Sequence, residues 1–212
     1  MYLPSFNAEH DIPTLHALMR ANPLGTWSAM ADGGIAVNHI PFLLRDDGTE
    51  FGVLVGHVAR ANPIWKTCDR SVDSVVAFHA EQAYISPSWY PSKQEHGKVV
   101  PTWNYAMVHA EGTPRFIEDK DWLRAQIDEL THAHENDFET PWKTSDAPED
   151  YLATMLKGIV GVEIPLSSLT GKWKLGQNRS QADQQGMIQH LESSDRAEAI
   201  AMAARMREKL EK

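Results

Sequence analysis

The stretch from Ala83 to Tyr105 combines side chains that ordinary loops and ordinary core strands rarely share. It contains two tryptophans, three tyrosines and three prolines, together with serines and lysines, and its one acid is Glu95. Aromatic rings and prolines stiffen such a segment, while hydroxyl, amide and ammonium groups supply hydrogen-bond donors. These residue types indicate a preformed pocket for a flat, partly anionic ligand.

A second candidate lies in the segment GHVARANPIW (56–65), where a predicted strand runs into a turn. Backbone N–H groups, Arg60 and Asn62 can converge there on a phosphate, which suits the planar fork of an arginine. The alternative for Arg60 is a structural role, in which it caps carbonyl groups or pairs with a surface acid. On the preceding predicted strand, Asn38 and His39 form another polar pair.

The segment GKWKLGQNR (171–179) reverses the charge of its surroundings. It holds three cations and no acid, in a chain whose formal net charge is −9. This reversal indicates an element that faces an anion, and the alternative is a solvated loop that keeps the chain soluble. Four of the seven tryptophans fall in the three segments described so far.

The bulk composition limits the class of protein. Hydrophobic residues make up 42% of the 212 residues and charged residues 23%, which is typical of a globular protein. No apolar run is long enough for a membrane span, the N-terminus lacks the features of a secretory signal, and Cys68 is the single cysteine. We therefore expect a cytoplasmic protein with a reduced thiol. The acidic balance argues against strong non-specific DNA binding.

Periodicity and turn signals predict a mainly β fold with peripheral helices, an α+β arrangement in which a small antiparallel barrel carries the helices outside. Apolar side chains occupy both faces of residues 51–59, as in a barrel strand covered by helices. The predicted strands are 24–30, 35–45, 51–59, 72–85, 99–110, 115–118 and 159–166. The predicted helices are 11–21, 63–67, 119–135, 149–157, 180–191 and one that begins near Asp195.

Taken together, six segments resemble the PaiB family, the FMN-binding negative transcriptional regulators. They are NHIPFLL (38–44), GHVARANPIW (56–65), AYISPSWYPSK (83–93), HGKVVPTWNY (96–105), PWKTSDAP (141–148) and GKWKLGQNR (171–179). The resemblance implies a split β-barrel of the flavin-reductase and pyridoxamine-phosphate-oxidase type, as a homodimer with FMN at the subunit interface. The expected domain division places the FMN-binding domain in residues 1–170, followed by a basic segment with C-terminal helices in residues 171–212.

The same resemblance gives expected roles to individual residues. Arg60 and Lys98 are assigned to the FMN phosphate, with Asn62 and Ser86 as supporting donors. Trp89, Tyr90 and Trp103 pack on the ring or close its pocket, whereas Thr102 and Asn104 lie on the opposite strand face and reach the pyrimidine edge. Since both faces of one strand cannot contact one ring, these two assignments compete. The expected contributions of the partner subunit come from Lys174, Asn178 and Arg179.

Histidines and the C-terminal helices leave two alternatives open. His39, His57 and His96 lie in the family motifs and are candidate donors to flavin or an axial ligand to haem, although a structural role is the simpler interpretation. No metal site is expected. For DNA binding, the candidate element is the helical pair 180–211, whose last turns carry Arg205, Arg207, Lys209 and Lys212 among acids. The pattern leaves open whether the chain is a flavin-dependent oxidoreductase or a regulator.

Overall fold

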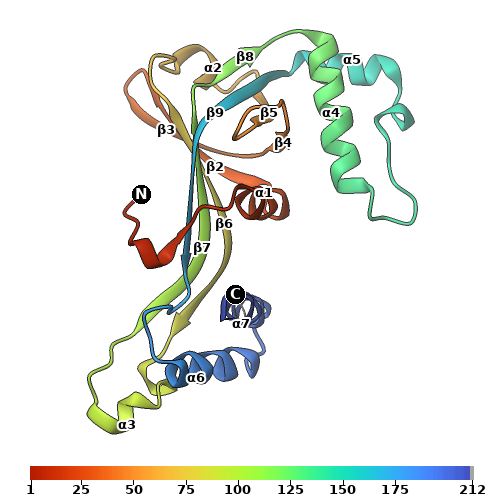
Figure 1. Ribbon diagram of the computed structural model, residues 1–212. Helices are drawn as coiled ribbons and strands as arrows, with labels where there is room; N and C mark the ends of the chain where they lie inside the picture. Colours follow the sequence, from red (N-terminus) through yellow and green to blue (C-terminus); the bar gives the residue numbers. More distant parts are fainter. Residues whose placement is uncertain (211–212) are drawn as a thin grey trace. The chain divides into compact units, whose positions relative to one another are not determined.

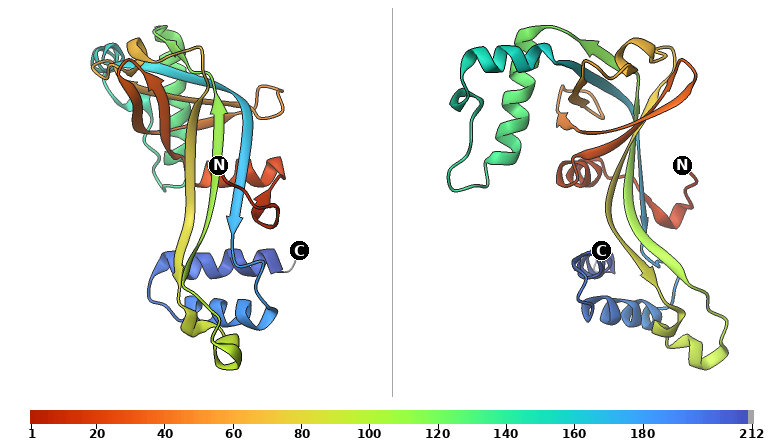
Figure 2. Two further views of the ribbon diagram at one scale, coloured as in Figure 1. Left: turned by 90° about the vertical axis from the view of Figure 1, so that its left-hand side faces the viewer. Right: turned by 180° about the vertical axis from the view of Figure 1, so that it is seen from behind.

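The computed structural model describes residues 1–210, so Lys212 lies outside the described residues (Figures 1 and 2). The strands are β1 (Ala8–Glu9), β2 (Leu24–Ala31), β3 (Gly34–Pro41), β4 (Leu43–Arg45), β5 (Val53–Ala59), β6 (Ser74–Ile85), β7 (Thr102–Gly112), β8 (Arg115–Ile117) and β9 (Ile159–Lys174). The helices are α1 (Ile12–Ala21), α2 (Ile64–Thr67), α3 (Ser92–His96), α4 (Lys120–Glu135), α5 (Glu149–Lys157), α6 (Gln181–Glu192) and α7 (Ala197–Leu210), with short 3-10 turns η1 (Ser5–Asn7), η2 (Pro87–Trp89) and η3 (Thr144–Asp146).

The strands hydrogen-bond in the order β3-β2-β6-β7-β9-β5-β4, and β1 and β8 each pair with β9. β2 pairs antiparallel with both β3 and β6, and β9 pairs antiparallel with β5. Every residue of β5 from Val53 to Gly56 is buried, which confirms the prediction that helices or strands cover both of its faces. The mainly β architecture with outer helices is therefore as predicted.

The chain forms two compact units, which are described separately. The first contains residues 1–18, 79–108 and the chain from Thr170, and the second contains residues 19–78 and 109–169. The strands β6, β7 and β9 run through both. Each unit combines several separate segments of the chain, whereas the expected boundary at residue 170 divides the chain once. That boundary stays a prediction.

In the second unit, Trp27, Leu54, Val76, Phe78, Val160 and Ile164 form the buried core. The predicted strand 35–45 is interrupted at Phe42, which is buried and packs edge-on against Phe78 at 6.3 Å between ring centroids. The backbone N–H of Phe42 donates to the Pro23 carbonyl (2.9 Å). The ladder therefore breaks at Phe42 into β3 and β4.

In the first unit, α6 and α7 lie side by side (Figures 1 and 2). The hydroxyl of Ser180, the first residue of the predicted helix 180–191, caps α6 by accepting from the Asp183 N–H (3.2 Å). Met187, Leu191 and Met202 are completely or almost completely buried. The apolar faces of the two helices thus form part of the core of this unit, together with Leu15, Ile85 and Trp173.

The strand β9 is longer than the predicted strand 159–166. Its last residues pair with β1, in the register Ala8 with Lys172 and Glu9 with Gly171. The apolar and polar alternation stops at the polar residues after Leu166, and β9 is held extended beyond that point by pairing with its neighbouring strands, β7 and β1. As a result, Lys172 and Lys174 belong to a strand and lie on one face of it.

The cations of α7 are held by acids of the same unit. Arg205 donates two hydrogen bonds to Glu81 (2.5 and 2.9 Å), and Lys209 pairs with Glu9 (3.1 Å). Burial alone would raise the pKa of Glu81, but the bonds from Arg205 outweigh it and hold that pKa below its ordinary value of 4.5. The pair fixes α7 onto β6.

Lowering the pH should therefore weaken the fold through Glu81. A carboxyl whose pKa is depressed in the folded state contributes stability above its unfolded pKa and loses it as the pH falls through the folded pKa. We expect Glu81→Gln to lower the free energy of unfolding at pH 7 by about 1–2 kcal/mol. Below pH 4.5 the difference in the free energy of unfolding between the variant and the parent should shrink. Urea titrations at pH 7 and at a pH below 4.5 measure this difference. A constant difference at all pH values would exclude this titration.

Candidate functional site

A cavity of about 500 Å³ lies in the first unit, at the start of β7 and the end of β9. Aromatic rings and cations dominate its wall, and none of the lining residues is acidic. They are Tyr2, Pro4, Phe6, Asn7, Tyr90, Thr102, Trp103, Asn104, Tyr105, Lys172, Lys174, Gly176, Asn178 and Arg179. Because the chain as a whole is acidic, such a composition marks a place that favours anions.

The aromatic rings of the cavity lie against its cations. The Lys172 ammonium is 5.4 Å from the centroid of Tyr105 and 5.6 Å from that of Tyr2. The guanidinium carbon of Arg179 is 4.9 Å from the centroid of Tyr90, which is almost completely buried. These are cation–π distances, so the rings partly stabilise the charges without neutralising them.

None of the three cations forms an ion pair within 4 Å among the described residues. Lys172 donates to the Tyr2 carbonyl (2.9 Å), and Lys174 donates to the Thr102 hydroxyl and the Trp103 carbonyl. Asp183 acts on Arg179 electrostatically, but its carboxylate oxygens accept from Ser92. The positive charge of the cavity is therefore not neutralised by a carboxylate in contact.

Two groups of the cavity show the effect of this environment. Burial lowers the pKa of Lys174, and repulsion from Lys172 and Arg179 lowers it further. The hydroxyl of Tyr90 is buried without a hydrogen-bond partner, and the Arg179 guanidinium lies near it outside hydrogen-bond geometry. An anion with several oxygens would relieve the repulsion and provide acceptors.

Seven of the residues predicted from the sequence line this cavity. They are Tyr90, Thr102, Trp103, Asn104, Lys174, Asn178 and Arg179. Residues of both faces of β7 are among them, and the Asn104 amide donates to the Met206 sulfur (3.5 Å) on α7, so the expected competition between the two faces for the ring stays a prediction. Trp103 is about half exposed and packs edge-on against Tyr84.

Four other predicted residues of the first unit do not line the cavity, and one of them, His96, is exposed and accepts from the Lys98 N–H (3.0 Å). Ser86 caps η2 by accepting from the Ser88 N–H (3.2 Å), and Lys98 is exposed. Trp89 stacks on His190 of α6, with 5.5 Å between ring centroids and 13° between planes. Their assignment to a ligand stays a prediction.

The remaining predicted residues belong to the second unit. Asn62 donates to the Asn38 side chain (2.7 Å) and accepts from the Ile64 N–H (3.0 Å), so this pair fixes the turn before α2. His57 is hydrogen-bonded to Gln126 of α4 (2.8 Å), and His39 is exposed on β3. Their roles toward flavin or haem stay predictions.

Arg60 is extensively bound within the second unit. Its guanidinium donates to the carbonyls of Lys157 (2.8 Å) and Ile159 (3.0 Å) and to the Glu118 carboxylate (2.5 Å). These are the contacts of the structural alternative considered for this residue. Its assignment to a phosphate stays a prediction.

Replacement of Arg60 separates the two roles. If Arg60 joins α5 to β9 only structurally, Arg60→Ala should lower the free energy of unfolding by about 2 kcal/mol, because it removes three hydrogen bonds of a partly buried charge. If it binds phosphate, the variant should lose at least about tenfold in FMN affinity. Urea unfolding and flavin titration on the same preparation measure both effects. Unchanged flavin affinity would remove Arg60 from the site.

Sequence reasoning missed several lining residues. Tyr105 lies two residues after Trp103, and Lys172 lies two residues before Lys174. The two-residue period of a strand could therefore have placed each on the same face as its predicted neighbour. The residues of the N-terminal segment, Tyr2, Pro4, Phe6 and Asn7, gave no such signal. They reach the cavity because β1 pairs with the end of β9.

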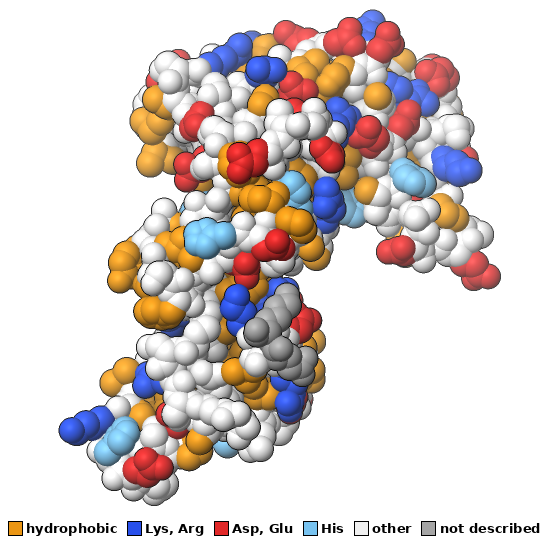
Figure 3. Space-filling model, in the orientation of Figure 1, with side chains coloured by type: hydrophobic (Ala, Val, Ile, Leu, Met, Phe, Trp, Pro, Cys, Tyr) orange, Lys and Arg blue, Asp and Glu red, His pale blue; other side chains and the backbone are white. Residues whose placement is uncertain are grey.

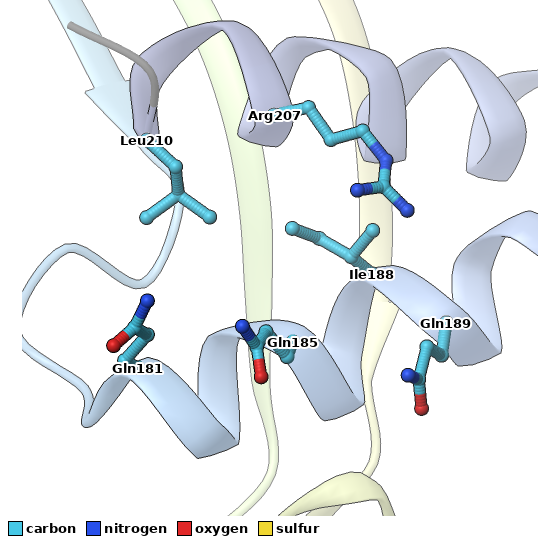
Figure 4. Close-up of a pocket in the computed structure, with 6 residues that line it drawn as sticks. All are labelled: Gln181, Gln185, Ile188, Gln189, Arg207 and Leu210. Atoms are coloured by element: carbon cyan, nitrogen blue, oxygen red, sulfur yellow. The ribbon is translucent and has the colours of Figure 1, made fainter.

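A second cavity, of about 420 Å³, lies between α6 and α7 (Figure 4). Gln181, Gln185 and Gln189 follow one face of α6, and Arg207 and Leu210 come from α7. Arg207 donates to both oxygens of Glu192 (2.6 and 2.8 Å), so its charge is compensated. This cavity therefore lacks the anion preference of the first.

The strand order and outer helices define a split β-barrel, the predicted fold class. Two solved structures share this fold. The FAD and haem binding protein of Mycobacterium smegmatis is 17% identical with a TM-score of 0.56, covering 80% of this chain and 74% of its own. A structure described as a "putative 5-nitroimidazole antibiotic resistance protein" of Bacteroides thetaiotaomicron is 14% identical with a TM-score of 0.55, covering 78% of this chain and 85% of its own.

The chain belongs to the family described as "Putative FMN-binding domain", which its residues 1–168 match. The "Protease synthase and sporulation protein PAI 2" of Bacillus subtilis is 31% identical over 214 residues, spanning 100% of this chain and 99% of that protein. An uncharacterised protein of Emericella nidulans is 34% identical over 244 residues, with 98% and 97% covered. The predicted membership of the PaiB family is confirmed, and with it FMN as the family's cofactor.

Proposed function

We propose that this chain binds FMN through the cavity of its first unit, with the phosphate held by Lys172, Lys174 and Arg179. The observation that carries this proposal is the group of three cations without a contacting carboxylate in an aromatic-lined cavity. A phosphate monoester carries up to two negative charges and matches such a group. The flat isoalloxazine ring matches the aromatic wall.

Different residues of the cavity bind different parts of FMN. The two lysines and Arg179 fix the phosphate, while Tyr90, Trp103 and Tyr105 exclude water from the ring and orient it. The buried Tyr90 hydroxyl, which lacks a partner, is available to a polar group of the ligand. When bound, FMN supplies hydride-transfer chemistry.

A comparison of FMN with riboflavin tests this proposal. Riboflavin carries the same ring without the phosphate. We expect FMN to bind at least about tenfold more tightly, with a preference that falls as salt is added. Quenching of flavin fluorescence measures both affinities. Equal affinities for the two flavins would show that the three cations do not hold a phosphate.

For the activity, we propose a flavin-dependent oxidoreductase in preference to a DNA-binding regulator. Arg205, Arg207 and Lys209, the cations of the candidate DNA-binding helix, are each paired with an acid of the first unit. On the face shown in Figure 3, acidic and basic side chains are intermingled and form no basic stripe. Reduction of the bound flavin by NADH or NADPH tests the enzyme, and a salt-dependent mobility shift tests the regulator.

We also propose a homodimer, based on an exposed apolar face of the second unit. Met30 and Ile35 are paired across β2 and β3, and Val37 follows on the same face; all three are about half exposed or more. β3 is at the end of the strand order, so its free edge can pair or pack. Light scattering of the parent and of Val37→Lys measures whether a dimer forms and whether this face holds it.

Among residues 1–210, no helix is long and apolar enough to cross a membrane, and no group of three His, Cys, Asp or Glu side chains has the arrangement of a metal site. The cytoplasmic location stays a prediction. Haem stays the alternative cofactor, although none of His39, His57 and His96 lines the cavity. An absorbance spectrum of the purified protein distinguishes flavin from haem.

A further inference from the structure

We propose that Lys174 is a nucleophilic amine that captures phosphorylated aldehydes of flat ring systems as an imine. The ligand class follows from the cavity: cations for the phosphate, aromatic residues for the ring, and a partly buried amine for the carbonyl carbon. This proposal uses the cavity to which we assign FMN, but it does not require FMN to bind there.

The environment of Lys174 differs from that of the other lysines. Lys66, Lys93, Lys98, Lys120, Lys143 and Lys157 are exposed. Lys209 is paired with Glu9, and Lys172 holds the Tyr2 carbonyl. Lys174 is partly buried, has no carboxylate in contact and lines the cavity.

The hydrogen bonds of Lys174 suit a neutral amine. Its nitrogen donates to the Thr102 hydroxyl and to the Trp103 carbonyl. A neutral amine has two N–H groups and one lone pair, so these two acceptors leave the lone pair unused. A phosphate bound beside it would favour the ammonium form, so Lys174 acts as a cation toward FMN and as an amine in the cavity without FMN.

The charged groups around Lys174 also favour the neutral form. Lys172 comes from the same strand, and Arg179 follows that strand; both are cationic. Tyr2, Tyr90 and Tyr105 are the other titratable groups of the cavity wall. Burial and the two cations lower the pKa of Lys174, a pattern that activates lysines toward carbonyl compounds.

The reaction is balanced without an oxidant or reductant. The neutral amine attacks the aldehyde carbon, an N–C bond forms, and the carbonyl π bond breaks to give a carbinolamine. Loss of one water molecule, whose oxygen comes from the aldehyde and whose two protons come from the nitrogen, yields the imine. Lys172 and Arg179 hold the phosphate during both steps.

Pyridoxal 5′-phosphate is a suitable probe, because it combines a phosphate, a flat ring and an aldehyde. We expect saturable imine formation, trapped by borohydride and located on Lys174 by peptide mass analysis. The apparent affinity for pyridoxal, which lacks the phosphate, should be at least about tenfold weaker. The reaction should already be fast at a pH below the ordinary lysine pKa of 10.5.

Lys174→Arg keeps a long basic side chain and removes the nucleophilic primary amine, so it should abolish saturable labelling. Lys120→Arg, at an exposed position of α4, should leave it unchanged. The mapping on the parent protein needs no variant, so it decides the matter even if Lys174→Arg is unstable. Labelling spread over the exposed lysines, or equal reactivity of pyridoxal and its phosphate, would overturn the proposal. Labelling of Lys174 in a protein that does not bind FMN would support this inference and contradict the proposed function.

Discussion

Replacing Arg179 with Met should reduce FMN affinity at least about tenfold and leave riboflavin affinity nearly unchanged. The guanidinium of Arg179 has no carboxylate in contact and lies over the ring of Tyr90, at the wall of the cavity. A charge-assisted bond to phosphate contributes about 1.5–3 kcal/mol, and 1.4 kcal/mol corresponds to a factor of ten. Because methionine keeps the apolar stem of the side chain, the loss should reflect the charge.

A second substitution and the salt dependence of FMN binding test the same prediction further. The double variant Lys172→Met, Arg179→Met should bind FMN more weakly than either single variant and should lose most of the salt dependence. Lys120→Met removes an exposed cation of α4 and serves as the matched control. Fluorescence titrations at low and high salt measure all of these affinities. If Arg179→Met binds FMN as well as the parent, the phosphate lies elsewhere, and Arg60 becomes the next candidate.

Much of the fold could be predicted because local signals agree with the final structure. The helix predicted at 149–157 is α5, residue for residue, and the hydroxyl of Ser180 caps α6. Two-sided burial of β5 also follows from its continuous apolar run. In these elements, propensity and tertiary packing favour the same conformation.

The end of β9 could not be predicted, since a distant segment determines it. Residues 167–174 lack a clear alternation of apolar and polar side chains, and β9 is held extended by pairing with β7 and, at Gly171 and Lys172, with β1. Such a pairing joins residues more than 160 positions apart in the sequence, as in Ala8 with Lys172. No local pattern encodes a contact of this kind.

The candidate site shows the same difference between local and distant information. Trp103, Lys174 and Arg179 were found because rings and cations are unusual in their segments, and the structure brings them to one cavity. Tyr2 and Phe6 were missed because two aromatic residues near a chain end carry no local meaning. The structure relates them to Lys172 through the Tyr2 carbonyl.

Replacing Gly186 with Ala should destabilise the protein, although the same change usually stabilises the middle of a helix. A Cβ atom at this position of α6 would lie 2.2 Å from the Trp89 carbonyl oxygen and 3.1 Å from Cδ of Pro91. Since the oxygen belongs to the backbone, either α6 or η2 must move. In an unconstrained helix, alanine would instead be favoured by roughly 1 kcal/mol.

We expect Gly186→Ala to lower the free energy of unfolding by about 3 kcal/mol, which corresponds to a fall of roughly 6–12 °C in Tm for a chain of this size. FMN affinity should fall with it, because η2 precedes Tyr90 and α6 follows Arg179, so their displacement separates two walls of the cavity. Gly158→Ala, just after α5, is the comparison variant: its Cβ would be 3.2 Å from the Met155 carbonyl oxygen, a milder contact, so a smaller loss of stability is expected. Thermal unfolding with and without FMN measures both effects. A Gly186→Ala variant with unchanged Tm would show that α6 does not need its close contact with η2, and the cavity would then depend on β7 and β9 alone.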